Sequence, residues 1–200
     1  MSRTDAEEIL ELVREAGLVR PRDLESAGIS GGSLPRLARR GLLERVSRGL
    51  YGVPGAVPSE HRSLAEISKR TPRGVVCLLS ALRFHGLTTQ GPPEVWLAIG
   101  PKDRAPREDG VRLRIVRVSG EARDTGIETH LVDGVPIRIY GVAKTVADCF
   151  KFRNKIGIDI AVEALRDSLE QRRCTTNELY EYARVCRVSR VMQPYMEALA

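Results

Sequence analysis

The stretch from Leu34 to Pro54, LPRLARRGLLERVSRGLYGVP, is unusually rich in positive charge. It contains five arginines and a single acid, Glu44. A solvated helix face usually mixes opposite charges, because like charges at i,i+4 spacing cost roughly 0.2–0.5 kcal/mol per pair. Contact with an anion would offset that cost. An ordinary solvated surface is the alternative explanation, and we favour contact with DNA.

The charge of the whole chain is also distributed unevenly. Residues 26–54 have a net charge of +4 and residues 69–123 a net charge of +6, whereas residues 124–200 hold eleven basic and eleven acidic groups. Residues 1–25 have a net charge of −3. Two local basic zones favour a nucleic-acid partner more than a uniform excess would. The acidic first segment would repel DNA, so we expect it to support the fold.

The elements that would position these arginines follow from apolar periodicity. Helical spacing predicts a first helix that ends at Gly17 and a short second helix that begins at Pro21 and ends at Gly28. A third helix is predicted in SLPRLARRG, followed by strands at 43–46 and 50–53 around a turn at 47–49. Three helices followed by a β-hairpin form a winged helix-turn-helix, which places its third helix in the major groove.

The third helix would bury Leu34, Leu37 and Ala38 on one face. Because proline is tolerated only in a first turn, Pro35 favours Ser33 as the N-cap. Gly31 and Gly32 would form a flexible entry to the helix. The opposite face and the hairpin would supply the DNA-binding residues, which are Ser33, Arg36, Arg39, Arg40, Arg45 and Arg48.

Different roles are expected of these arginines. Arg36 and Arg39 could present a guanidinium fork to guanine O6 and N7. Arg40, Arg45 and Arg48 are better placed to contact phosphates, with Arg48 at the tip of the wing. Some would therefore position the protein, and one or two would read bases.

The rest of the chain predicts a linker and a mixed α+β domain. Residues 55–63 contain Gly, Pro and Ser without periodicity. We therefore expect a winged helix-turn-helix domain over 1–54, a linker over 55–63 and an α+β domain over 64–200 with a small sheet and a helical C-terminal half. Helices are predicted at 64–69, 75–85, 142–153, 159–171, 176–185 and 190–199, and strands at 92–99, 111–118, 127–132 and 136–140. Asp133-Gly134 is a strong hairpin signal between the last two strands.

The residue types do not favour an enzyme. None of the five lysines has an acid two residues before it, as a restriction-type nuclease would require. Gly31-Gly32-Ser33 lacks the pair of metal-binding aspartates that a nucleotidyltransferase needs, because one carboxylate cannot hold Mg²⁺ between phosphates. Lys144, Thr145 and Asp148 form the cluster with the most chemical character. A helix start with an i,i+4 ion pair is the simpler interpretation.

Metal, cofactor and membrane sites are not expected either. The four cysteines, Cys77, Cys149, Cys174 and Cys186, are far apart and form no CxxC pair. They are interpreted as buried or half-buried reduced thiols of a cytoplasmic protein. No apolar run is long enough to span a membrane, and the N-terminus does not resemble a secretory signal.

The pattern AGLVRPRDLESAGISGGSLPRLARRGLLERVSRGLYGVP resembles the winged-helix domain of AbiEi-type antitoxins of bacterial type IV toxin–antitoxin (abortive infection) systems. The phrase RGLLERVSRGLYGVP carries most of the specificity. The stretches VCLLSALRFHGLTTQGPPEVWLAI and GVAKTVADCFKFRNKIGIDIAVEALRDSL resemble the C-terminal domain of that family. The resemblance thus covers nearly the whole chain.

This resemblance implies a DNA-binding antitoxin. It would bind inverted repeats upstream of its own operon, as a dimer on DNA, and repress transcription. Its C-terminal domain would neutralise a nucleotidyltransferase-like toxin without forming a stable complex with it. The resemblance implies DNA contact by the residues named above and gives a set of candidates for antitoxicity, which are Lys144, Thr145, Asp148, Lys151 and Arg153.

The sequence allows two other functions, and it allows two roles for one basic strand. Related N-terminal domains occur with other C-terminal domains, so a repressor of unrelated genes with a ligand- or protein-sensing domain is the main alternative. A DNA-directed nuclease is a third interpretation. The strand residues Arg112, Arg114 and Arg117 are either solvated or form a second anion-binding surface, for RNA for instance.

Overall fold

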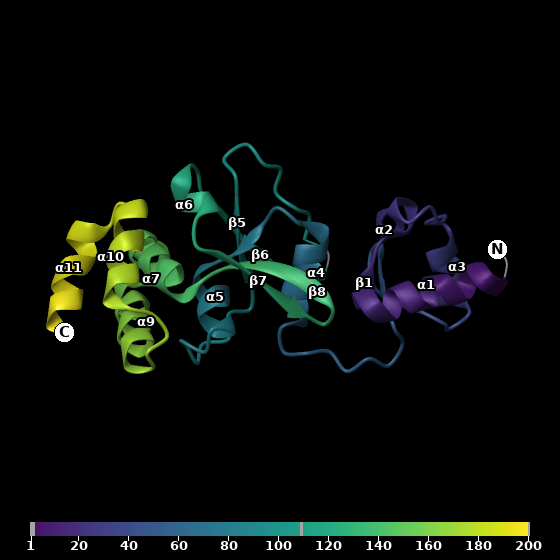
Figure 1. Ribbon diagram of the computed structural model, residues 1–200, viewed down its shortest axis with the longest axis horizontal. Helices are drawn as coiled ribbons and strands as arrows, with labels where there is room; N and C mark the ends of the chain where they lie inside the picture. Colours follow the sequence, from purple (N-terminus) through teal and green to yellow (C-terminus); the bar gives the residue numbers. More distant parts are fainter. Residues whose placement is uncertain (1–2, 109, 200) are drawn as a thin grey trace. The chain divides into compact units, whose positions relative to one another are not determined.

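The computed structural model describes residues 3–108 and 110–199, and the chain divides into two compact units (Figure 1). The first comprises Met1–Pro72, Pro106–Val111 and His130–Ile137, and the second comprises Arg73–Ala105, Arg112–Thr129 and Arg138–Ala200. Among the described residues, no helix is both long and apolar enough to cross a membrane.

The first unit contains a winged helix-turn-helix. Its elements are α1 (Arg3–Ala16), β1 (Leu18–Val19), α2 (Pro21–Ser26), α3 (Ser33–Arg39), β2 (Glu44–Ser47) and β3 (Leu50–Gly52), followed by α4 (Arg62–Arg70). Strand β1, which the sequence did not predict, pairs antiparallel with β3, so the sheet has the order β1-β3-β2. The strand therefore ties the end of α1 to the base of the wing.

A small apolar core holds these helices against the wing. Leu34 and Leu37 of α3 are fully buried, as the periodicity predicted, and they pack with Ile9 and Val13 of α1 and with Tyr51 of the wing. Burial of a leucine side chain contributes about 1.5–3 kcal/mol. The inward face of α3 is thus fixed by packing, and the opposite face is left to solvent.

The second unit is built around a five-stranded sheet. Its strands are β4 (Val75–Val76), β5 (Val95–Ile99), β6 (Leu113–Arg117), β7 (Ile127–Val132) and β8 (Val135–Tyr140), in the order β6-β5-β4-β8-β7. Strand β4 pairs antiparallel with β5 and parallel with β8, and β5 pairs parallel with β6. The tip of the hairpin, residues 130–137, belongs to the first unit.

The turn between β7 and β8 confirms the sequence signal. Asp133 and Gly134 have φ values of 48° and 77°, the left-handed conformation that a two-residue hairpin turn of type I′ requires. Asparagine, aspartate and glycine adopt this conformation at the lowest cost. The dipeptide therefore sets the register of the hairpin.

The second unit also contains α5 (Leu78–Phe84) and α6 (Glu121–Asp124), and its C-terminal part is helical. That part consists of α7 (Val142–Lys151), α8 (Arg153–Ile156), α9 (Ile158–Glu170), α10 (Thr176–Val185) and α11 (Ser189–Ala198). Helix α7 is buried along nearly its whole length, and α9, α10 and α11 pack against it in one apolar core. Figure 1 shows α9, α10 and α11 gathered at the C-terminal end with α7 between them and the sheet.

One predicted helix is wrong. Residues 75–85 were expected to form a single helix, but Val75–Val76 form β4 and the helix begins only at Leu78. A short run of buried apolar residues has no periodicity that separates a strand from a helix. Pairing of β4 with both β5 and β8 satisfies its backbone on two sides and decides the outcome.

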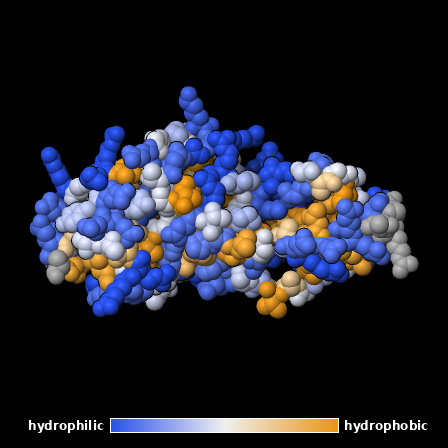
Figure 2. Space-filling view, in the orientation of Figure 1, coloured by the Kyte–Doolittle hydropathy of each residue, from blue (hydrophilic) through white to orange (hydrophobic). Residues whose placement is uncertain are grey.

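The structure confirms the expected fold class, a mixed α+β chain with an N-terminal winged helix-turn-helix. The compact units divide the chain after Pro72, and the domain boundaries at 54 and 64 stay a prediction. Figure 2 shows hydrophilic residues over much of the face in view, with hydrophobic residues in separate patches.

Candidate nucleic-acid interface

The outward face of α3 presents guanidinium groups to solvent. Arg36, Arg39 and Arg40 are all exposed, at the end of a seven-residue helix whose other face is buried. Arg39 Nε donates a long hydrogen bond of 3.4 Å to the Pro35 carbonyl. The two terminal nitrogens of the guanidinium group are thus left to contact a partner. The three side chains therefore form one basic face.

The wing adds two further exposed arginines. Arg45 lies on β2 opposite Tyr51, and Arg48 lies in the turn between β2 and β3. Gly49 follows it with a φ of 68°, the left-handed conformation that lets the chain reverse within two residues. The hairpin thus places Arg48 at the wing tip, as the sequence predicted.

Two expectations for the start of α3 are wrong. Ser33 is only 3% exposed and lies inside the helix, and Gly32 takes the N-cap position without a side-chain cap. The Ser33 hydroxyl is thus not on the arginine face. Gly31 is not a flexible entry, because a Cβ atom there would lie 2.7 Å from the Cβ of Pro21. Close approach of α2 and the start of α3 requires glycine at this position.

The residues proposed for antitoxicity fall into two groups. Lys144, Thr145 and Asp148 are at most 1% exposed, so they are core residues of α7. Lys151 and Arg153, at the end of α7 and the start of α8, are only partly buried. The simpler interpretation, an i,i+4 ion pair in a helix, is correct in its geometry, but the pair is buried.

The buried cluster is held by a set of short polar contacts. Lys144 Nζ donates to Asp148 Oδ2 at 2.5 Å and lies 4.0 Å from the ring centroid of Tyr140. Cys186 Sγ donates to Asp148 Oδ1 at 3.2 Å. Thr145 Oγ1 donates to the Tyr140 carbonyl at 2.9 Å and so anchors the first turn of α7 to the end of β8. Each polar group of the cluster thus has a partner.

Burial dominates the electrostatics of this cluster. It raises the pKa of Asp148, and the attraction of Lys144 and the hydrogen bonds from Lys144 and Cys186 only partly oppose it. Burial also raises the pKa of Cys186 to about 12, with a further contribution from the charge of Asp148. The Cys186 thiol therefore stays protonated at neutral pH, and a protonated thiol is a poor nucleophile.

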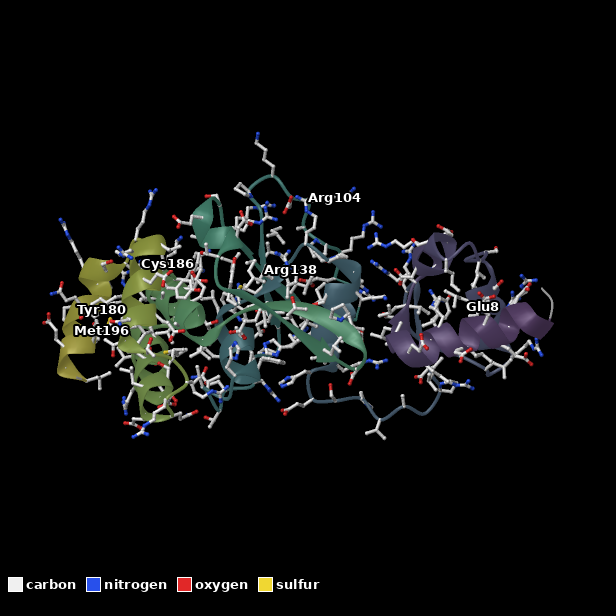
Figure 3. All side chains as sticks on the ribbon, viewed as in Figure 1. Glu8, Arg104, Arg138, Tyr180, Cys186 and Met196 are labelled. Carbon is white, nitrogen blue, oxygen red and sulfur yellow. The ribbon has the colours of Figure 1, made fainter. Side chains whose placement is uncertain are left out.

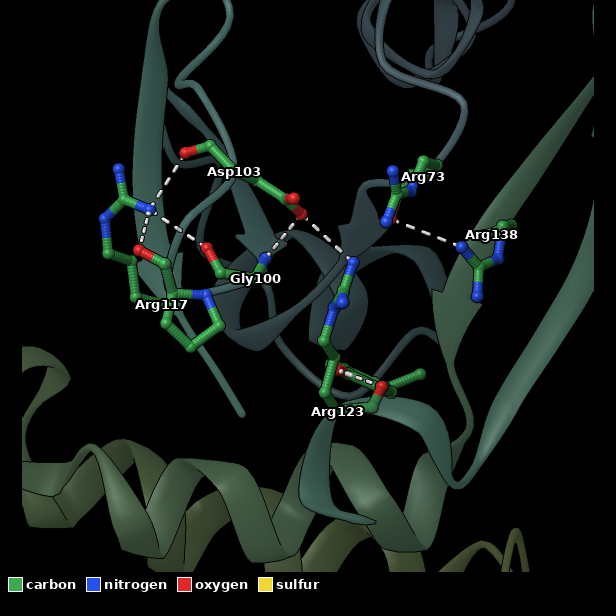
Figure 4. Close-up of polar contacts among 8 residues, drawn as sticks. Arg73, Gly100, Asp103, Arg117, Arg123 and Arg138 are labelled. Atoms are coloured by element: carbon green, nitrogen blue, oxygen red, sulfur yellow. Dashed lines mark hydrogen bonds and ion pairs between the residues drawn. The ribbon is translucent and has the colours of Figure 1, made fainter. Parts of the chain in front are cut away.

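The basic strand β6 has structural partners. Arg117 Nη1 donates to the carbonyls of Gly100, Pro101 and Asp103 at 2.8–3.0 Å and so holds the loop that follows β5 (Figure 4). Arg114 pairs with Glu94 at 3.1 Å. Arg117 is exposed, as expected of a solvated residue, but its Nη1 also binds three carbonyls of the protein.

The Asp103 side chain also stabilises the loop after β5. The Asp103 carboxylate accepts from the Gly100 amide at 2.8 Å and from Arg123 Nη2 at 3.1 Å (Figure 4). Arg112 is exposed. Among the described residues, no group of three or more His, Cys, Asp or Glu side chains could hold a metal ion.

Comparison with known proteins identifies the N-terminal region. Residues 7–54 match the model of the family described as "Transcriptional regulator, AbiEi antitoxin". The resemblance stated from the sequence is therefore confirmed over these residues. No curated protein sequence matches the chain.

A solved structure supports the fold of most of the chain. The crystal structure of the RV2827C protein from Mycobacterium tuberculosis superposes with a TM-score of 0.57 at 17% sequence identity, covering 91% of this chain and 72% of that one. At this identity the similarity concerns the fold alone.

Proposed function

We propose that this chain, whose residues 7–54 match the model of AbiEi antitoxins, is a cytoplasmic DNA-binding antitoxin that represses its own toxin–antitoxin operon. The observation that carries the proposal is the exposure of all five arginines on α3 and the wing. Lysine and arginine side chains that neutralise DNA phosphates release counterions, and this release supplies much of the affinity.

Each arginine would have one of two roles. Arg36 and Arg39 would enter the major groove with α3 and read guanine through paired hydrogen bonds. Arg40, Arg45 and Arg48 would contact phosphates and fix the position of the protein. Two copies on an inverted repeat would place two α3 helices in successive major grooves, so we expect a dimer on DNA.

The second unit would supply the antitoxin activity, without catalytic chemistry of its own. The counterpart is a nucleotidyltransferase-like toxin, and no stable complex is expected. Lys151 and Arg153 are the candidates that solvent can reach. Lys144, Thr145 and Asp148 would act indirectly, because their burial lets them shape α7 but not touch a partner.

The first experiment is a gel-shift titration on the upstream region of the operon and on a scrambled duplex, at two salt concentrations. We expect cognate binding to be far tighter, and the preference to disappear in Arg36→Ala/Arg39→Ala. Equal affinity for both duplexes would overturn the repressor proposal. Metal-dependent cleavage of the duplex would favour a nuclease instead.

A rescue assay tests the antitoxin half separately. Co-expression with the neighbouring toxin gene should restore growth, and Arg36→Ala/Arg39→Ala should still rescue when both genes are under a foreign promoter. A neighbouring gene that encodes no toxin, together with sequence-specific DNA binding, would favour a repressor of other genes.

A further inference from the structure

A groove in the second unit collects cations from separate parts of the chain. It has a volume of about 880 Å³ and is lined by residues 119–122 at the start of α6, by the junction of α7 and α8, and by the end of α10 with the turn after it. Four basic side chains line it, namely Lys151, Arg153, Arg184 and Arg187. Nothing in the repressor function uses this groove.

The cations in the groove are not neutralised by the acids beside them. Two carboxylates, Glu121 and Glu181, also line the groove, which leaves a net charge of +2. Among the described residues, neither carboxylate forms an ion pair with one of the four cations. Arg153 donates one hydrogen bond, from Nη1 to the Phe150 carbonyl at 2.9 Å. The other N–H groups of its guanidinium remain to bind a ligand.

Helix ends account for only part of this charge. Basic residues in the last turn of a helix compensate the partial negative charge of its C-terminal carbonyls, which is about half an elementary charge. Lys151 in α7 and Arg184 in α10 have this position. Arg153 binds the Phe150 carbonyl in the last turn of α7, and Arg187 follows the end of α10. Four cations therefore line the groove beside two helix C-termini of about half a negative charge each.

Apart from Glu121 and Glu181, the part of the wall formed by Cys186 adds no negative charge. Cys186, labelled in Figure 3, lines the groove, and its thiol donates to the buried Asp148 behind it. The charge of Asp148 is compensated by Lys144 at 2.5 Å. A thiol that stays protonated and a compensated carboxylate do not repel an anion, so the charge of the groove is that of its four cations and two carboxylates, a net +2.

We propose that this groove binds a small ligand through two or more linked phosphate groups, such as a nucleoside triphosphate. Guanidinium groups match phosphate geometry with paired hydrogen bonds. The volume lies in the range of small-molecule sites, about 300–1,000 Å³. The twelve lining residues include no aromatic side chain to stack on a base, so the phosphates supply the affinity. Glu121 and Glu181 disfavour a polyanion that fills the whole groove.

Two arginines in the same backbone conformation provide a matched pair of variants. Arg187 follows the end of α10 with a φ of 60°, and Arg172 follows the end of α9 with a φ of 52°. Arg187 lines the groove and Arg172 does not. Glycine is favoured at such a position, so either arginine can be replaced by glycine without added backbone strain.

The experiment is isothermal titration calorimetry of the full chain with inorganic tripolyphosphate, ATP and adenosine at low salt. We expect tripolyphosphate and ATP to bind with similar affinity and adenosine not to bind. The variant Arg184→Gln/Arg187→Gly should weaken binding by about 30-fold or more, because it removes two charge-assisted contacts. The control Arg166→Gln/Arg172→Gly removes the same charge from exposed positions of the same unit and should bind as the unchanged protein does.

Three results would overturn the proposal. The first is an absence of tripolyphosphate binding up to millimolar concentration, and the second is an equal loss of affinity in the control variant. The third is a single-stranded RNA that binds through the same arginines much more tightly than tripolyphosphate, which would assign the groove to nucleic acid. Operator binding by the groove variant should be unchanged, so failure here is distinguishable from failure of the repressor function.

Discussion

Lys144 and Asp148 form an ion pair that is sealed inside the second unit. The two charged atoms are 2.5 Å apart, and the side chains are 0% and 2% exposed. A buried pair contributes little net stability, because desolvation of both charges offsets their attraction. Loss of one partner is costly, since it leaves an uncompensated charge in the core.

Removal of one charge should therefore be worse than removal of both. We expect Asp148→Asn to lower the free energy of unfolding by about 3–5 kcal/mol and Lys144→Met/Asp148→Leu to restore most of that loss. Urea unfolding followed by the fluorescence of Trp96, the single tryptophan and a core residue of this unit, measures both. A double variant as unstable as Asp148→Asn would contradict this account.

Helix α10 begins with a complete capping box. Thr175 Oγ1 accepts from the Glu178 amide at 3.2 Å, and the Glu178 carboxylate accepts from the Thr175 amide at 2.7 Å. Thr175→Ala should cost about 1 kcal/mol of stability. Thr176→Ala, one residue later and also exposed, is the control and should cost little.

The capping box should also make stability depend on pH. The amide of Thr175, and then its hydroxyl, lower the pKa of Glu178 below its usual value near 4.5. The contribution of Glu178 is therefore present above about pH 4.5 and is lost as the pH falls through the lowered pKa. The stability difference between Thr175→Ala and the unchanged protein should shrink over that acidic range, measured by unfolding at a series of pH values. A constant difference would show that the Thr175 hydroxyl does not stabilise the Glu178 carboxylate, because alanine keeps the amide at position 175.

Gly31 and Gly32 should respond differently to the same substitution. A Cβ at Gly31 would lie 2.9 Å from the Pro21 carbonyl oxygen, whereas a Cβ at Gly32 would meet nothing closer than 3.6 Å. Gly31→Ala should therefore destabilise the contact between α2 and α3 by about 1–3 kcal/mol, as overpacking does. Hydrogen exchange of the α2 and α3 amides should accelerate in Gly31→Ala and not in Gly32→Ala.

Arg117 should matter more than Arg114, although both are exposed arginines of β6. Arg117 holds three carbonyls of the loop after β5, whereas Arg114 makes one surface ion pair of the kind that contributes at most about 1 kcal/mol. Arg117→Ala should speed hydrogen exchange at residues 100–105, and Arg114→Ala should not. Equal exchange rates at residues 100–105 in both variants would mean that Arg117 does not stabilise the loop.

The arginines of α3 and the wing should differ in how they affect specificity. Arg36→Ala or Arg39→Ala should cost about 1–3 kcal/mol at the cognate site and relax specificity. Arg48→Ala should weaken binding to all duplexes and reduce the salt slope by about one unit. Gel shifts on cognate and random DNA at several salt concentrations separate these effects. Identical behaviour of the three variants would contradict the assigned roles.

The sequence alone determined the winged helix and the position of its arginines. Apolar spacing on α3, the glycine at the wing tip and the Asp133-Gly134 turn act locally, so periodicity and turn chemistry were sufficient to place them. Periodicity and turn chemistry gave wrong predictions where the structure of a segment depends on residues that are distant in the sequence. Val75–Val76 became a strand because β5 and β8 pair with it from both sides. Burial of Ser33 at the start of α3 was likewise decided by packing.

In the second unit, only the tertiary structure decided which charged residues are buried and which line a common groove. Lys144 and Asp148 have the i,i+4 spacing of a surface pair, and burial of α7 between the sheet and three later helices places them in the core instead. Arg184 and Arg187 carried no motif, and they meet Lys151 and Arg153 only because α10 packs against α7. Helical periodicity fixes which side chains share a face, and packing between distant segments fixes what that face touches.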